Sequence, residues 1–173
     1  ASEAVVVLGG SEMIPSVRFQ DALDPARTQR TVVDPGEGRQ AEPGSVVTFA
    51  YAAFDAASGD LIDAVGYRSP PAQAVLDGTS LVAGLEDVIL CSSAGSRIAA
   101  VIPPEETFNG MGSEQYGIGA SDSVVVIVDV VSVAADRAQG EREAVMDSLP
   151  EVHVGATGEP QVTIPPKSPP TTY

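Results

Sequence analysis

Residues 95–112 read GSRIAAVIPPEETFNGMG and change character abruptly in the middle. The small and β-branched residues up to Ile102 favour a buried strand. Pro103 and Pro104 end that strand, because proline has no backbone N–H to donate to a sheet. Two acids, one Phe and two glycines follow by residue 112. The stretch therefore predicts a strand that leads directly into an acidic, aromatic and flexible loop.

Alternating apolar residues predict another strand in residues 45–54. Val47, Phe49 and Tyr51 lie on one side of an extended chain, and the residues between them lie on the other. The turn-forming ASGD at 57–60 then precedes a further extended run, LIDAV. We therefore expect the two runs to form a hairpin.

A short helix and a central strand complete the predicted core. In GLEDVILC, residues 84–91, the apolar residues Leu85, Val88 and Ile89 recur at the spacing of one helical face. DSVVVIVDVVSV, residues 122–133, is a nearly continuous β-branched run, typical of a central strand. One short helix against several antiparallel strands predicts an α+β fold.

The chain is expected to contain four segments. The α+β domain spans residues 26–134. Before it, residues 1–25 contain AVVVLGG and PSVRF, which indicate extra N-terminal strands at the edge of the sheet. After it, residues 135–148 have the polar, helix-favouring composition of a linker, and residues 149–173 are expected to form an extended tail.

The tail contains a sequence similar to one near the N-terminus. LPEVHVGATGEP at 149–160 matches IPSVRFQDALDP at 14–25 in its aliphatic, proline, valine and basic or imidazole positions. We interpret residues 149–173 as the start of a truncated second repeat. The alternative is a chance match between two strands that are flanked by proline.

Charge and cysteine content exclude several classes of function. A net charge of −15 opposes binding to nucleic acid or to an anionic membrane surface. The single Cys91 cannot form an intramolecular disulfide, and one thiol with one distant histidine, His153, is too little for a zinc site. Cys91 is expected to be a half-buried packing thiol. We expect no metal and no cofactor.

Three ordered motifs carry a resemblance to a known family. GSVVTFAYAAFDAASGDLIDA, LVAGLEDVILCSSAGSRIAAVIPPEETF and DSVVVIVDVVSV resemble, in this order, the FKBP family of peptidyl-prolyl cis-trans isomerases over about residues 30–133. The resemblance implies an antiparallel sheet of about five strands wrapped on one short helix. It also implies that the loop after Pro104 brings Phe108 to the rim of a proline pocket and continues as a flap.

The resemblance also implies a set of site residues. Tyr51, Asp63 and Phe108 match the positions given a catalytic role, and Arg68 stands where the family places a basic partner for Asp63. Substrate-binding positions are matched by Ile62, Arg68, Leu81, Val82, Leu85, Ile118 and Val126. No metal ligand is implied.

Several positions depart from the family pattern. Ile62, Ala72 and Val126 each replace a usual Phe, and Leu85 replaces a Trp on the pocket floor. Phe108 lacks the hydroxyl of the family's rim Tyr. Because aromatic side chains supply large contact areas, a pocket without them is expected to bind proline weakly.

Two functions remain open at this point. The first is a weak peptidyl-prolyl isomerase, or rotamase, that desolvates the prolyl amide of exported or cell-surface proteins and so assists protein folding. The alternative is a catalytically lapsed FKBP-like binding or spacer module.

The segments outside the domain imply a cellular setting. Together with the domain, they resemble the first of two FKBP-like domains in exported actinobacterial lipoproteins. That resemblance implies an extracytoplasmic location, with membrane attachment only through a lipid anchor outside this chain. The expected partners are proline-containing polypeptide segments.

Overall fold

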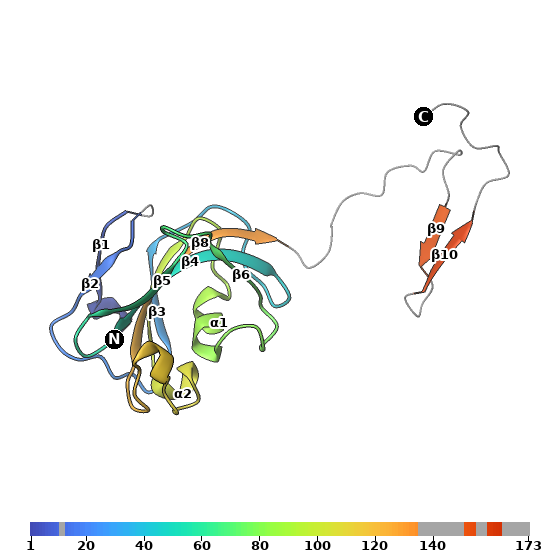
Figure 1. Ribbon diagram of the computed structural model, residues 1–173. Coiled ribbons are helices and arrows are strands. Elements are labelled where there is room, and N and C mark those ends of the chain that lie inside the picture. Colours follow the sequence, from blue (N-terminus) through green and yellow to red (C-terminus); the bar gives the residue numbers. More distant parts are fainter. Residues whose placement is uncertain (11–12, 135–150, 155–158, 164–173) are drawn as a thin grey trace. The chain divides into compact units, whose positions relative to one another are not determined.

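The computed structural model describes residues 1–10, 13–134, 151–154 and 159–163. The chain divides into two compact units, Ala1–Ala138 and Gln139–Tyr173. The first unit contains the predicted α+β domain and the N-terminal extension (Figure 1). The predicted linker at 135–148 lies outside the described residues.

An antiparallel sheet of six strands forms the centre of the first unit. The strands are β3 (Gln29–Asp34), β4 (Val46–Asp55), β5 (Leu61–Val65), β6 (Ala72–Val75), β7 (Arg97–Ile102) and β8 (Val124–Ala134). Their order is β3-β7-β8-β4-β5, and β6 pairs with the first residues of β4. The predicted α+β class and antiparallel sheet are confirmed. The prediction missed β6, whose four residues carry little pattern.

The quoted stretch forms the strand that its composition predicted. Strand β7 is buried along its whole length and ends at Ile102, immediately before Pro103. Beside it, β8 is buried from Val124 to Val130. Both faces of these two strands are covered, which explains why their sequences are continuously apolar rather than alternating.

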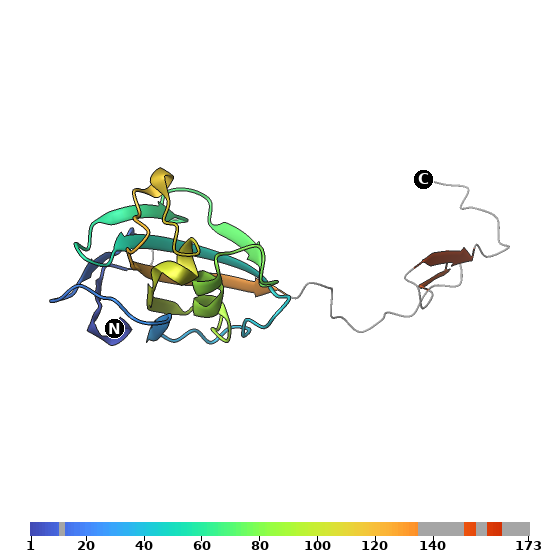
Figure 2. The same cartoon turned by 90° about the horizontal axis from the view of Figure 1, so that it is seen from below.

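Helix α1 (Ala83–Ile89) lies against one face of the sheet, and a second short helix lies beside it. Helix α1 buries Val88 and Ile89 completely, as the spacing predicted. It is followed by Cys91, which has φ of 61° and is exposed, so the prediction of a half-buried thiol is wrong. Helix α2 (Pro104–Thr107) follows β7 and lies next to α1 on the same side of the sheet (Figure 2).

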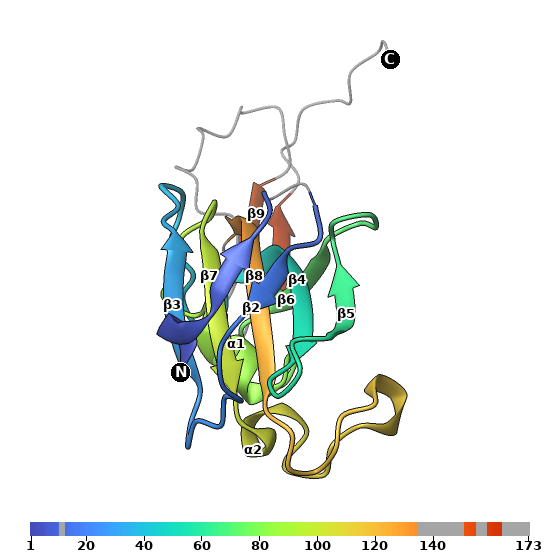
Figure 3. The same cartoon turned by 90° about the vertical axis from the view of Figure 1, so that its left-hand side faces the viewer.

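The N-terminal segment covers the opposite face of the sheet. After the short helical turn η1 (Ser2–Ala4), strands β1 (Val6–Leu8) and β2 (Ser16–Arg18) pair only with each other. Their hairpin crosses in front of β7 and β8 in Figure 3, where α1 lies behind the sheet. The prediction that these strands extend the edge of the main sheet is therefore wrong. Val17 instead packs into a second apolar cluster that includes Ala99 and Ile127.

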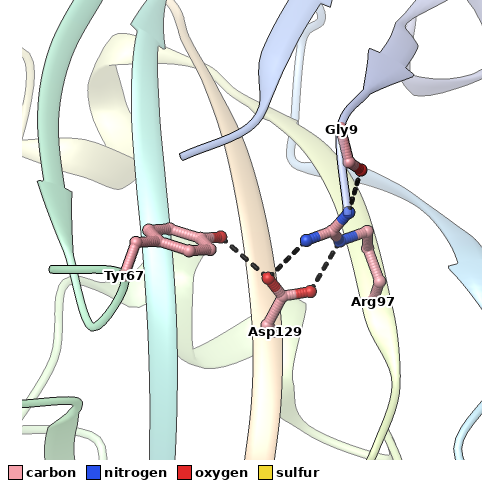
Figure 4. A network of polar contacts seen from close by, with 4 residues as sticks. All are labelled: Gly9, Tyr67, Arg97 and Asp129. Carbon is pink, nitrogen blue, oxygen red and sulfur yellow. Dashed lines mark hydrogen bonds and ion pairs between the residues drawn. The ribbon is translucent and has the colours of Figure 1, made fainter. Parts of the chain in front are cut away.

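A buried polar network ties this hairpin to the sheet (Figure 4). The Arg97 guanidinium donates to both carboxylate oxygens of Asp129 on the neighbouring strand, at 2.6 and 2.7 Å. Its remaining nitrogen, Nη1, donates to the carbonyl of Gly9 at 2.7 Å. The Tyr67 hydroxyl donates to Asp129 at 2.9 Å. The ion pair thus links β7, β8 and the hairpin at one point.

The second unit contains a hairpin of its own. Strand β9 (Glu151–Val154) pairs antiparallel with β10 (Pro160–Thr163). In the repeated sequence, β9 occupies the place that β2 occupies in the first copy. Both copies therefore form a strand at the same point, although β2 pairs with the segment before it and β9 with the segment after it.

Candidate functional site

An apolar cavity of about 320 Å³ lies between the sheet, α1 and the loop before β8. Nine of the ten predicted site residues line it: Tyr51, Ile62, Asp63, Leu81, Val82, Leu85, Phe108, Ile118 and Val126. The structure therefore brings these residues into one pocket, while their individual roles stay predictions. Arg68 is exposed and lies outside the cavity lining.

Strands β4 and β5 place a hydrogen-bonded pair in the pocket wall. Tyr51 lies on the same side of β4 as Phe49, and Asp63 of β5 pairs with Ala53, which also lines the pocket. The Tyr51 hydroxyl donates to Asp63 at 2.7 Å. Burial, and then this bond to a carboxylate, raise the pKa of Tyr51 well above its usual value. The phenol is thus protonated at neutral pH.

The predicted ion pair between Asp63 and Arg68 is wrong. The one ion pair among the described residues joins Arg97 and Asp129. The Asp63 carboxylate instead accepts from the Tyr51 hydroxyl and from the backbone N–H of Ala64, at 2.9 Å. Because Arg68 follows β5 in an exposed turn, its side chain lies outside the wall that holds Asp63.

The loop before α1 positions two more lining residues. Glu86, which is buried, accepts the backbone N–H of Gly78 on both carboxylate oxygens at 3.0 Å. Backbone bonds from Thr79 and Ser80 lower the pKa of Asp77 to about 2 and hold the turn. The chain then passes Leu81 and Val82, which line the cavity, and enters α1.

The loop between α2 and β8 forms the remaining wall, and we call residues 108–122 the flap. Phe108 lies at its start, and the Phe108 ring stacks on Tyr116 with centroids 6.0 Å apart. Backbone hydrogen bonds between Ser113 and Ile118 close a turn over residues 114–117. Gly112 is required here, because its φ is 67° and a Cβ would collide with the Ile118 carbonyl oxygen.

Two aromatic lining residues were missed by the sequence analysis. Phe49 lies on the pocket side of β4, its ring centroid 6.2 Å from that of Tyr51. The alternation that placed Phe49 and Tyr51 on one face was a sufficient signal for it. Tyr116 lines the cavity from the flap. Its only signal was an isolated aromatic residue in a glycine-rich loop, which does not specify where the ring lies.

The pocket chemistry is that of an apolar binding site. Among the described residues of the lining, Asp63 is the one that carries a charge, and its carboxylate accepts a hydrogen bond from Tyr51. Within the described residues, no group of three or more His, Cys, Asp or Glu could hold a metal ion. No helix in the described part of the chain is long and apolar enough to cross a membrane. The arrangement suits a small apolar ring with a neighbouring polar backbone.

An antiparallel sheet, a short helix against one face and an apolar pocket walled by a flap define a domain of the FKBP class. The family model for FKBP-type peptidyl-prolyl cis-trans isomerase matches residues 37–131, which is more than half of the chain. The chain belongs to this family.

Two curated relatives support this assignment. A probable FK506-binding protein of Corynebacterium glutamicum is 33% identical over 97 residues, which cover 56% of this chain and 79% of the relative. An FK506-binding protein of Streptomyces anulatus is 24% identical over 119 residues, covering 69% of this chain and 96% of the relative.

Solved structures share the fold. FkpA from Escherichia coli matches with a TM-score of 0.56 and 24% identity, covering 64% of this chain and 49% of its own. The three FKBP domains of wheat FKBP73 match with a TM-score of 0.59 and 24% identity, covering 64% of this chain and 47% of theirs. The chain thus spans about half the length of these two proteins.

Proposed function

We propose that this protein is a weak peptidyl-prolyl cis-trans isomerase. The observation that carries the proposal is the pocket itself: an apolar cavity of about 320 Å³ whose wall holds the Tyr51–Asp63 pair. Membership of the FKBP-type family supports the same reaction class.

The proposed mechanism needs no nucleophile. Rotation about an amide has a barrier of about 18–20 kcal/mol, because resonance gives the C–N bond double-bond character. That resonance form is dipolar and is stabilised by water. Removing a prolyl amide from water into the apolar cavity disfavours the planar form relative to the twisted transition state. The bond between Tyr51 and Asp63 keeps this wall rigid while the substrate rotates.

Lining residues of modest size are the reason for proposing weak activity. Ile62, Ala72, Leu85 and Val126 all line the cavity. Each offers less contact area to a pyrrolidine ring than an aromatic side chain would. Phe49 and Tyr116 restore some of that area from other positions. The same four residues support the second candidate, a module that binds extended segments or separates other domains without catalysis.

The proposed clients are proline-containing segments of exported or cell-surface proteins. This part of the proposal is supported by the resemblance of the flanking segments to those of exported lipoproteins and by the acidic composition, with a net charge of −15. Fractionation of the native cells, with an antibody against this domain, tests it. Recovery of the protein in the cytosolic fraction would contradict it.

Proline-limited refolding of a model protein tests the activity. The uncatalysed step takes tens of seconds, so a small acceleration is measurable. We expect the wild type to accelerate it slightly and Leu85→Trp to accelerate it more, since an indole on the pocket floor adds apolar contact with the proline ring. Val32→Trp is the matched control, because Val32 is 48% exposed on the edge strand β3 and lies outside the cavity.

Folding of each variant must be measured beside its activity. Overpacking by the indole costs about 1–3 kcal/mol, so urea unfolding identifies a Leu85→Trp protein that is simply destabilised. If the wild type and a folded Leu85→Trp both leave the refolding rate unchanged, the isomerase proposal fails and the non-catalytic module takes its place.

A further inference from the structure

Among the residues that the structure describes, one side-chain hydroxyl of the pocket lining takes part in no hydrogen bond. Four other polar side chains in the lining already donate to an acceptor in the protein: Tyr51 to Asp63, Thr107 to Pro104, Ser80 to Asp77 and Gln73 to Thr48. The hydrogen bonds of the described residues include none from the Tyr116 hydroxyl, although Tyr116 lines the same cavity. Its proton is therefore available to a ligand.

Tyr116 is also held in place. Its ring stacks on Phe108 at a centroid distance of 6.0 Å and an interplanar angle of 22°. The helical turn η2 (Glu114–Tyr116) ends at this residue, and the Ser113–Ile118 bridge closes the surrounding loop. Tyr116 lines the cavity, and 37% of its surface is exposed. Tyr116 thus lines the pocket with an anchored ring that is partly open to solvent.

A prolyl peptide in this pocket needs such a donor. Its backbone carbonyls lose water on binding, and a buried carbonyl without a partner costs free energy. The donor cannot usefully serve the X–Pro carbonyl, because a hydrogen bond there would strengthen the double-bond character of the C–N bond and oppose rotation. The carbonyl of the proline residue itself is not part of the rotating amide, so a bond to it fixes the substrate without this penalty.

We propose that the Tyr116 hydroxyl donates a hydrogen bond to the carbonyl oxygen of the bound proline residue and so determines how the peptide lies in the pocket. The inference rests on the proposed binding of prolyl peptides and assigns a substrate-binding role to a residue of the flap. Phe108, which has no hydroxyl, stacks on the Tyr116 ring and holds it in place.

Titration of acetyl-Ala-Ala-Pro-Ala-amide against the full chain, followed by NMR, tests the proposal through the dissociation constant. Tyr116→Phe removes the hydroxyl and keeps the stacked ring. We expect it to weaken binding about two- to tenfold, the range that corresponds to one neutral hydrogen bond. Tyr67→Phe is the matched control, because its hydroxyl is bonded to Asp129 outside the cavity. That variant should bind as the wild type does.

Two further measurements separate a hydrogen bond from a general disturbance of the flap. The double variant Tyr116→Phe/Phe108→Tyr moves the hydroxyl to the neighbouring ring and should recover part of the lost affinity. A peptide with a thiocarbonyl on its proline, a weaker acceptor, should bind the wild type less tightly but should not lose affinity for Tyr116→Phe.

The outcomes distinguish this inference from the proposed function. If the wild type and Tyr116→Phe bind the peptide equally and both accelerate its isomerisation, the inference is overturned and the isomerase proposal stands. If Tyr116→Phe binds more weakly but neither protein accelerates isomerisation, the inference stands and the isomerase proposal fails. Absence of peptide binding to the wild type at millimolar concentration overturns both.

Discussion

Removing both members of the Arg97–Asp129 pair should destabilise the first unit by less than the sum of the losses caused by removing each member alone. The two charges lie between the sheet and the N-terminal hairpin, and Arg97 is only 5% exposed. Arg97→Met leaves the Asp129 carboxylate with the Tyr67 hydroxyl as its remaining side-chain partner. Asp129→Leu leaves the guanidinium with the Gly9 carbonyl alone.

The magnitude follows from leaving a buried charge without its partner. Breaking a buried ion pair on one side typically costs about 3–5 kcal/mol, so we expect each single variant to lose that much free energy of unfolding. In a unit of this size, such a loss lowers Tm by about 10–20 °C. The double variant Arg97→Met/Asp129→Leu leaves neither charge unpaired. Its loss of free energy of unfolding should be at least about 2 kcal/mol smaller than the sum of the two single losses.

Urea unfolding of the wild type, both single variants and the double variant measures this coupling. An unchanged m value in each variant would indicate that the midpoints report stability alone. Tyr67→Phe serves as the control, since it removes one hydrogen bond and no charge, and should cost about 1 kcal/mol. If the double variant loses the sum of the two single losses in free energy of unfolding, within about 0.5 kcal/mol, an unpaired buried charge is not the main cost and the argument is refuted.

Three further predictions concern pH, the tail and salt. Burial raises the pKa of both Tyr51 and Tyr67 above the ordinary value, so these tyrosines ionise in the unfolded chain before they ionise in the folded one. The free energy of unfolding should therefore fall as pH rises above about 10. A Tyr51→Phe variant that loses stability as steeply as the wild type between about pH 9 and 11 would contradict this. Deletion of residues 139–173, which form a separate unit, should leave the unfolding midpoint of the first unit nearly unchanged, and a large drop in that midpoint would mean that the tail contributes to its core. Binding of a neutral proline peptide should depend little on ionic strength, because Asp63 is the one charged residue among the described residues of the pocket lining. A steep dependence would place recognition on the acidic surface instead.

Much of the site followed from short-range patterns. Alternation along β4 placed Phe49 and Tyr51 on one face, and the helical spacing in α1 predicted the burial of Val88 and Ile89. The resemblance to the family then indicated nine residues that the structure brings to a single cavity. The predicted pair of Asp63 with Arg68 is wrong, because a resemblance in sequence does not give the direction of a side chain in an exposed turn.

Two charged residues inside apolar strands form an ion pair that the sequence pattern alone does not specify. Asp129 is the one charged residue inside the apolar run of β8, and Arg97 opens the apolar run of β7. Together they indicate a buried ion pair, yet their register as direct neighbours exists only once the two strands pair. The outward apolar residues of the same strands likewise required a cover, which the N-terminal hairpin supplies.

The sequence by itself determined the position of the longer strands and of α1, because these depend on residues a few positions apart: Pro103 has no N–H to donate, and β-branched runs favour extended chain. Only the tertiary structure decided what covers each face of the sheet and which side chains meet in the pocket. The Tyr116 ring reaches Phe108 because the flap turns at Gly112, and Gly9 meets Arg97 because the hairpin crosses the sheet. Contacts between residues so far apart along the chain depend on how all the elements pack together, which no local pattern specifies.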